Sequence, residues 1–171
     1  MTIVYLKGSA TKPVGDGPKI ITHICNDIGG WGRGFVLAVS KDHPAAETAY
    51  RSWFQENPEW KDTPFLLGNV QFVNTAKDVK VANMIAQHGI FTKDGRSPIR
   101  YIALIQCLTQ VAEHALEYGA SVHMPRIGCG LAGGEWSKVE KCINNTLGRA
   151  GVPVFVYDYE ASGPEVIPWN K

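Results

Sequence analysis

Apolar residues follow two different spacings along this chain. In short segments they alternate with polar residues, as in a half-buried strand, and in longer segments they recur every three or four positions, as in an amphipathic helix. Strands are expected at residues 3–6, 19–24, 65–67, 70–73, 79–85, 121–125 and 152–157. Helices are expected at residues 35–39, 45–54, 99–116 and 136–147. Strands and helices alternate in the second half of the chain, so the pattern predicts an α/β sheet covered by helices on both faces.

Turn residues separate these segments without dividing the chain. Gly68-Asn69 is expected to join the 65–67 and 70–73 strands as a hairpin-like pair, and Gly119 is expected to end the 99–116 helix. No internal repeat or linker is visible. The sequence therefore predicts a single domain over residues 1–171, with an irregular tail at about 160–171.

The composition is that of a folded domain with little net charge. Of the 171 residues, 44% are hydrophobic and 19% are charged, and the formal net charge is +1. A duplex nucleic-acid binder usually carries a basic stripe, so such a partner is not expected unless the nucleic acid itself carries the ligand. The 17 lysines and arginines still allow a local positive potential at a phosphate site.

The sequence shows no pattern typical of a metal site or of membrane insertion. The four cysteines form no CxxC pair and the five histidines are scattered, so neither a metal nor a resident cofactor is expected. There is no basic segment followed by an apolar stretch at the N-terminus, and no run of about 18 apolar residues. We therefore expect a cytoplasmic monomer that does not contact membranes.

Two glycine-rich loops, residues 26–34 and 128–134, each follow an expected strand and precede an expected helix. Glycine lets the backbone approach a ligand closely, and the free amides at a helix N-terminus favour an anion. Together the loops suggest a diphosphate held from two sides. Two glycine-rich turns without a ligand remain the structural alternative.

The second loop also matches the GxGxxG dinucleotide-binding fingerprint through Gly128, Gly130 and Gly133. Only one strand is expected after it, so the remaining residues cannot supply the second half of a Rossmann domain. A Rossmann domain is therefore not expected.

The loops and their surroundings resemble the macrodomain family over nearly the whole chain. LKGSAT is similar to the family's opening, THICNDIGGWGRGFVLAVSKDHPAAETAY to its first ligand loop, and HMPRIGCGLAGGEWSKVEKCI to its second. The first loop is nearest to yeast-type ADP-ribose-1″-phosphate phosphatases, and the second to terminal ADP-ribose protein glycohydrolases. The resemblance implies a three-layer α/β/α fold with a mixed central sheet and a substrate that contains ADP-ribose.

The resemblance also implies roles for individual residues. Asn26 would hydrogen-bond the distal ribose, and His23 and Gln87 would be the other catalytic candidates. Tyr157 would lie near the adenine. The residues expected to bind the substrate are Ser9, Ala10, Gly29, Gly30, Trp31, Gly32, Gly34, Phe35, Ile127, Gly128, Cys129, Gly130, Leu131, Ala132 and Tyr157.

Three positions depart from the family pattern. Ser9 stands where an aspartate usually contacts adenine. Gln87 and Ala132 stand where the glycohydrolase branch has its catalytic lysine and aspartate. A lysine-adduct mechanism therefore does not transfer to this chain.

Three functions follow as hypotheses. The first is hydrolysis of ADP-ribosyl esters, which would remove ADP-ribose from acidic side chains of modified proteins by positioning a water. The second is removal of phosphate from ADP-ribose-1″-phosphate, with His23 as general acid or base. The third is a non-catalytic reader. The expected partners are ADP-ribose and an ADP-ribosylated protein.

Overall fold

The computed structural model describes residues 3–55 and 62–159, in which six strands form one mixed sheet. The strands are β1 (Val4–Lys7), β2 (Lys19–Asn26), β3 (Val70–Ala76), β4 (Val79–Gln87), β5 (Ser121–Met124) and β6 (Val154–Asp158). Their order is β1-β6-β5-β2-β4-β3. Every neighbouring pair is parallel except β3 with β4. The carboxyl ends of the parallel strands therefore meet at one edge, where α/β proteins bind ligands.

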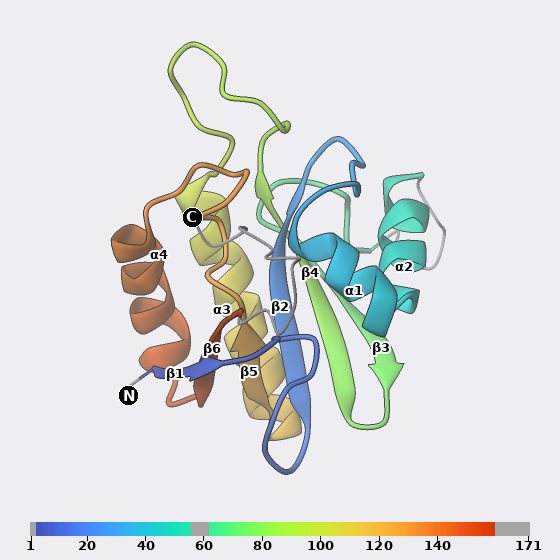
Figure 1. The fold of residues 1–171 in the computed structure, drawn as a ribbon, viewed down its shortest axis with the longest axis vertical. Coiled ribbons are helices and arrows are strands. Elements are labelled where there is room, and N and C mark those ends of the chain that lie inside the picture. The colour runs from blue at the N-terminus through green and yellow to red at the C-terminus, as the bar shows by residue number, and fades with distance from the viewer. Residues whose placement is uncertain (1–2, 56–61, 160–171) are drawn as a thin grey trace.

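Helices cover both faces of this sheet (Figure 1). They are α1 (Phe35–Asp42), α2 (Ala45–Phe54), α3 (Tyr101–Tyr118) and α4 (Trp136–Ile143), and α4 continues into one π-helical turn, η2 (Asn144–Gly148). The helices α1 and α2 pack on one face, and α3 and α4 pack on the other. The expected three-layer α/β/α fold is confirmed.

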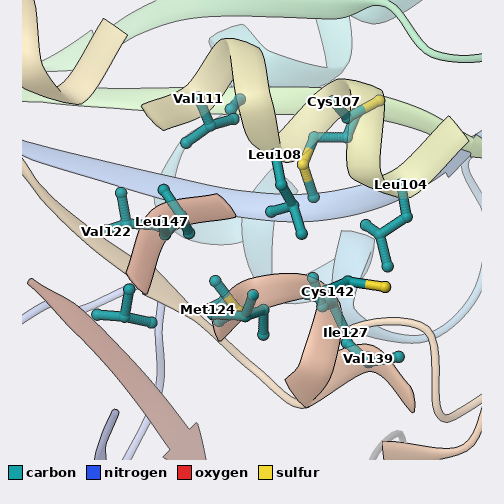
Figure 2. Close-up of a cluster of buried hydrophobic side chains, with 14 of the residues drawn as sticks. Leu104, Cys107, Leu108, Val111, Val122, Met124, Ile127, Val139, Cys142 and Leu147 are labelled. Atoms are coloured by element: carbon teal, nitrogen blue, oxygen red, sulfur yellow. The ribbon is translucent and has the colours of Figure 1, made fainter. Parts of the chain in front are cut away.

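Alternation along the central strands produces two cores. Ile20 of β2 faces α3 and α4, whereas the next residue, Ile21, faces α1 and α2, and both are almost fully buried. Figure 2 shows the α3–α4 side, where Leu104 and Leu108 of α3 lie against Met124 of β5. Because the middle of the sheet is buried on both faces, its strands are held rigidly under the loops at their ends.

The expected strand at 65–67 is wrong. These residues form bends and a turn, and the Phe65 ring packs against Tyr50 and Trp53 with ring centroids 5.5 and 5.0 Å away. The antiparallel hairpin instead joins β3 to β4 at Lys77-Asp78, where Asp78 has φ 58°. The prediction fails because the Phe65 side chain packs in an aromatic cluster beside α2 and not on a face of the sheet.

Other boundaries differ by a few residues. The 99–116 helix begins at Tyr101, because Ile99 is held in an isolated bridge with Gln87. The expected irregular tail lies outside the described residues. Within the described ranges, none of the helices combines the length and apolarity needed to cross a bilayer.

Candidate functional site

A cavity of about 470 Å³ opens at the carboxyl edge of the sheet, between the two glycine-rich loops. Its volume falls in the range of small-molecule sites, about 300–1,000 Å³. The expected site residues that line it are His23, Asn26, Gly30, Trp31, Gly32, Gly34, Phe35, Gln87, Ile127, Gly128, Gly130, Leu131 and Ala132. The fold therefore brings both loops and all three catalytic candidates to one cavity.

The Asn26 side chain organises the first loop from the last position of β2. Its Oδ1 accepts hydrogen bonds from the amides of Ile28 at 3.1 Å and Gly30 at 2.9 Å, and from the Tyr50 hydroxyl at 3.0 Å. Its Nδ2 donates to the Gly30 carbonyl at 2.8 Å. The oxygen is thus saturated, so Asn26 could contact a ligand only by donating the second Nδ2 hydrogen.

Trp31 forms one wall of the cavity and is fixed by α1 and α2. Its Nε1 donates to the Ser40 hydroxyl at 2.7 Å, which in turn donates to Glu47 at 2.7 Å. The bond from Ser40, and then that from Arg51, lowers the pKa of Glu47. With 6% of its surface exposed, Trp31 is a core anchor whose edge reaches the site.

His23 borders the cavity but is only 2% exposed, and its environment favours the neutral imidazole. Its Nε2 is 2.6 Å from Oδ1 of Asn83, whose Nδ2 donates to Gln71 at 2.9 Å. Since this second bond orients the Asn83 oxygen towards His23, Nε2 must carry the proton. Burial lowers the pKa of His23 to about 4. This arrangement supports a structural role for His23 under Trp31, whose ring centroid is 5.2 Å away.

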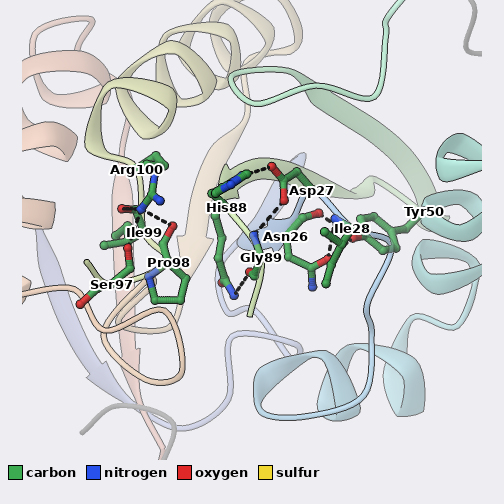
Figure 3. A network of polar contacts seen from close by, with 11 residues as sticks. Asn26, Asp27, Ile28, Tyr50, His88, Gly89, Ser97, Pro98, Ile99 and Arg100 are labelled. Atoms are coloured by element: carbon green, nitrogen blue, oxygen red, sulfur yellow. Dashed lines mark hydrogen bonds and ion pairs between the residues drawn. The ribbon is translucent and has the colours of Figure 1, made fainter. Parts of the chain in front are cut away.

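Gln87 ends β4 beside Asn26, with which it is in register. Its Nε2 donates to the Gly89 carbonyl at 3.0 Å. Asp27 fastens the same region, because its carboxylate accepts from the Gly89 amide at 2.8 Å and from His88 Nδ1 at 2.6 Å (Figure 3). The ends of β2 and β4 are therefore linked directly at the cavity floor.

The second loop is built on close packing that only glycine permits. Gly128 has φ 76°, and a Cβ there would lie 2.6 Å from the Ile99 side chain. The Gly134 amide donates to the Gly128 carbonyl at 2.6 Å, and Ile99 N donates to the Ala132 carbonyl at 3.0 Å. Close packing therefore fixes the shape of the loop, which contributes Gly128, Gly130, Leu131 and Ala132 to the cavity lining.

Several expected substrate-binding residues do not line the cavity: Ser9, Ala10, Gly29, Cys129 and Tyr157. Tyr157 is 1% exposed and points into the α1–α2 core, where its hydroxyl accepts from the Val14 amide at 3.0 Å. It therefore offers no open face to adenine. Burial raises the pKa of Cys129, which makes it a poor nucleophile.

The Ser9 hydroxyl is likewise engaged within its own turn. It lies 2.7 Å from the Thr11 hydroxyl, which donates to Asp42 at 2.6 Å. Ser9 thus helps to tie the segment after β1 to α1 at a distance from the cavity lining.

The sequence reasoning missed eight residues that line the cavity: Ile24, Cys25, Arg33, Val36, Ile90, Phe91, Pro125 and Arg126. Arg126 pairs with Asp158 through two hydrogen bonds, at 2.6 and 3.0 Å. Because Asp158 lies on another strand, no local spacing could reveal this pair. Ile90 and Phe91 come from a polar loop that held no chemical motif.

The described ranges contain no group of three or more metal-ligating side chains placed to hold an ion. The cavity instead offers glycine-loop backbone, two carboxamides and the arginines at its edges. Such a site suits a polar, anionic organic ligand.

Comparisons with known proteins agree with the fold. No family model matches the chain. A protein of unknown function from Bacteroides thetaiotaomicron is 55% identical, with a TM-score of 0.87 over 92% of this chain and 98% of that one. A macrodomain protein from Streptomyces coelicolor is 51% identical, with a TM-score of 0.80 over 93% of this chain and 100% of that one.

Two curated relatives are more distant. The mouse chromodomain-helicase-DNA-binding protein 1-like is 28% identical over 94% of this chain, which spans only 18% of that protein. The ADP-ribose 1″-phosphate phosphatase of Candida albicans is 24% identical over 82% of this chain and 91% of its own length. Given the Streptomyces relative, the shared fold and the two facing glycine loops, the chain belongs to the macrodomain family.

Proposed function

We propose that this protein binds ADP-ribose in the 470 Å³ cavity and hydrolyses ADP-ribosyl esters, which frees acidic side chains of modified proteins. One observation carries the proposal: two glycine-rich loops face each other across a single cavity, with Asn26 and Gln87 at its floor. The name of the Candida albicans relative supports a substrate that contains ADP-ribose.

The loops supply what a diphosphate requires. Residues 30–34 lead into the N-terminus of α1, and residues 128–134 lead towards that of α4. Backbone amides and the positive ends of the helix dipoles stabilise an anion without a metal. The distal ribose then lies over Asn26, where Trp31 and Phe35 exclude water from one side.

Hydrolysis rests on positioning, because no lysine or aspartate occupies the branch's catalytic places. The second Nδ2 hydrogen of Asn26 donates to a ribose hydroxyl, and Oε1 of Gln87 accepts a hydrogen from the attacking water. The water oxygen bonds to C1″ of the distal ribose as the bond between C1″ and the ester oxygen breaks, and the carboxylate departs with that bonding pair. A carboxamide cannot take up the water's second proton, so this proton is lost to solvent. Oriented water at a labile ester needs only moderate assistance.

The test is turnover of glutamate-linked ADP-ribosyl protein by Gln87→Ala. We expect kcat to fall about tenfold, with the Kd for free ADP-ribose nearly unchanged, because the water loses its partner and the other bond lost, to the Gly89 carbonyl, lies outside both glycine loops. Glu117→Ala, at the exposed end of α3, is the matched control. Full turnover in Gln87→Ala would remove Gln87 from the mechanism.

Phosphate removal from ADP-ribose-1″-phosphate is the second candidate, favoured by the name of the Candida albicans relative. The environment of His23 counts against it, because an imidazole with a pKa of about 4 is a poor general acid or base near neutral pH. Assaying both substrates side by side separates the two activities. Binding without turnover of either would indicate a reader.

A further inference from the structure

Residues 88–98, termed here the arm, form the yellow-green loop that projects at the top of Figure 1, and Ile90 and Phe91 of the arm line the cavity. The base of the arm is tied to both glycine loops. The His88 amide donates to the Pro98 carbonyl at 2.8 Å, and Asp27 of the first loop holds His88 and Gly89. On the other side, Ser97 packs so closely on Gly133 that a Cβ there would lie 2.8 Å from its hydroxyl.

The tip of the arm is an ordered hairpin. Lys93 and Arg96 exchange backbone hydrogen bonds of 3.1 and 2.9 Å. Asp94 and Gly95 between them have φ 53° and 72°, the positive values of a type I′ turn. The side chains of Lys93 and Arg96 therefore project from a fixed backbone.

The arm carries apolar side chains that belong to neither hydrophobic core. Phe91 is 76% exposed and Ile90 is 42% exposed, yet both line the mouth of the cavity. Apolar groups exposed together at the rim of a site usually mark a contact surface. The hydrophobic cores of this fold account for neither residue.

The same rim carries excess positive charge. Arg33 lines the cavity on the opposite loop, and Lys93, Arg96 and Arg100 lie on or beside the arm. Desolvation, and then the nearby charge of Arg96, lowers the pKa of Arg100, while the charge of Asp27 opposes this shift. The acidic groups in this region are fewer: Asp27 is already paired with His88, and Asp94 is the one carboxylate on the arm itself.

We propose that the arm docks the polypeptide segment that carries the ADP-ribose, and that it selects acidic segments. This inference rests on the proposed function and names its substrate class. Phe91 and Ile90 contact apolar parts of the segment, while Lys93 and Arg96 pair with its carboxylates. A net charge of +1 and a rim of only a few cations favour a short acidic peptide over a nucleic acid.

The test compares two charge reversals of equal size. The double variant Lys93→Glu/Arg96→Glu changes the arm, and Lys77→Glu/Arg149→Glu changes two exposed residues outside it. Each is measured on glutamate-ADP-ribosylated peptides with acidic or with lysine-rich flanks, and on free ADP-ribose by calorimetry. Phe91→Ser tests the apolar contact.

We expect the arm variant to have a KM and a Kd for the acidic peptide that are about tenfold higher, and to lose the preference for the acidic peptide over the lysine-rich one. Its Kd for free ADP-ribose should stay within about twofold of that of the original protein. The control should change none of these values. Equal losses on both peptides would overturn the proposal. So would weaker binding of free ADP-ribose, which would place the arm in the nucleotide site.

The two proposals can fail separately. If the protein binds the acidic peptide more tightly than free ADP-ribose but releases nothing, hydrolysis fails and the docking arm stands. If it hydrolyses both peptides equally well, the hydrolase stands and the arm proposal fails. If it does not bind ADP-ribose, both fail.

Discussion

Single side chains set the shape of the first loop more than its glycines do. Oδ1 of Asn26 accepts hydrogen bonds from three donors, one of which is the Tyr50 hydroxyl. The same hydroxyl also donates to the backbone carbonyl of Asn26 at 2.7 Å. Asn26, which is a candidate ligand contact, therefore also holds the conformation of the first glycine loop. Variants of Asn26 itself would mix these two effects, so a neighbouring residue gives the cleaner test.

Tyr50→Phe removes only the hydroxyl that braces Asn26. We expect the unfolding free energy to fall by about 1–3 kcal/mol and ADP-ribose affinity to fall several-fold, because buried acceptors lose their partner and the loop loosens. Calorimetry measures the affinity for ADP-ribose, and urea denaturation measures the unfolding free energy. Tyr118→Phe, at the exposed end of α3, is the control, and unchanged affinity in Tyr50→Phe would contradict the bracing role.

Thr22 on β2 is fully buried, and its Oγ1 has no hydrogen-bond partner among the described residues. Thr22→Val keeps the shape and removes the unsatisfied hydroxyl. We expect the unfolding free energy to rise by about 1 kcal/mol. A fall on denaturant titration would show that the hydroxyl is satisfied in solution.

Two buried histidines predict a loss of stability in acid. Burial lowers the pKa of His23 and of His123 to about 4, below the ordinary value of 6.5. Their neutral forms therefore stabilise the fold fully above pH 6.5, and each contributes a loss of about 1.4 kcal/mol per pH unit as the pH falls towards 4. NMR shifts of both imidazoles should remain those of the neutral ring down to about pH 5.5. Titration near 6.5 would contradict their burial.

At the scale of elements, the two glycine loops are positioned by strand ends and by what packs behind them. Gly128 and Gly151 both have positive φ, but only at Gly128 would a Cβ meet neighbouring side chains. Comparing alanine variants at these two positions therefore separates the cost of a positive φ from the cost of crowding at the site.

Gly128→Ala and Gly151→Ala form a matched pair. Both should lose about 1–2 kcal/mol of stability from the left-handed backbone. Only Gly128→Ala should also lose ADP-ribose affinity, by tenfold or more, because the added methyl displaces Ile99 and the loop above it. Equal affinities in the two variants, measured by calorimetry, would mean that the second loop does not hold the ligand.

The sequence predicted what local spacing controls and missed what pairing across the chain controls. Both loops follow strands and precede helices, so their place at one sheet edge was predictable. The burial of His23 depends on Asn83, 60 residues away, and the exclusion of Tyr157 from the cavity depends on which face of β6 it occupies. The local pattern around Phe65 predicts a strand because an aromatic cluster and a sheet face have similar local patterns.

At the scale of the whole molecule, two cores on opposite faces of one sheet hold its carboxyl edge rigid, and the cavity lies at that edge. In the function proposed above, the rigid part of the fold would hold the nucleotide, and the projecting arm would contact the rest of the modified protein. Under that proposal, changes in the arm would alter substrate choice without altering the ligand that the cavity binds.

The most direct test of the central claim is the release of ADP-ribose from a glutamate-linked ADP-ribosyl protein by the unmodified enzyme. Ester hydrolysis predicts release that grows with time and with protein concentration, and that free ADP-ribose inhibits as it fills the cavity. Tight binding of ADP-ribose without any release would contradict ester hydrolysis and would make the protein a reader of the modification.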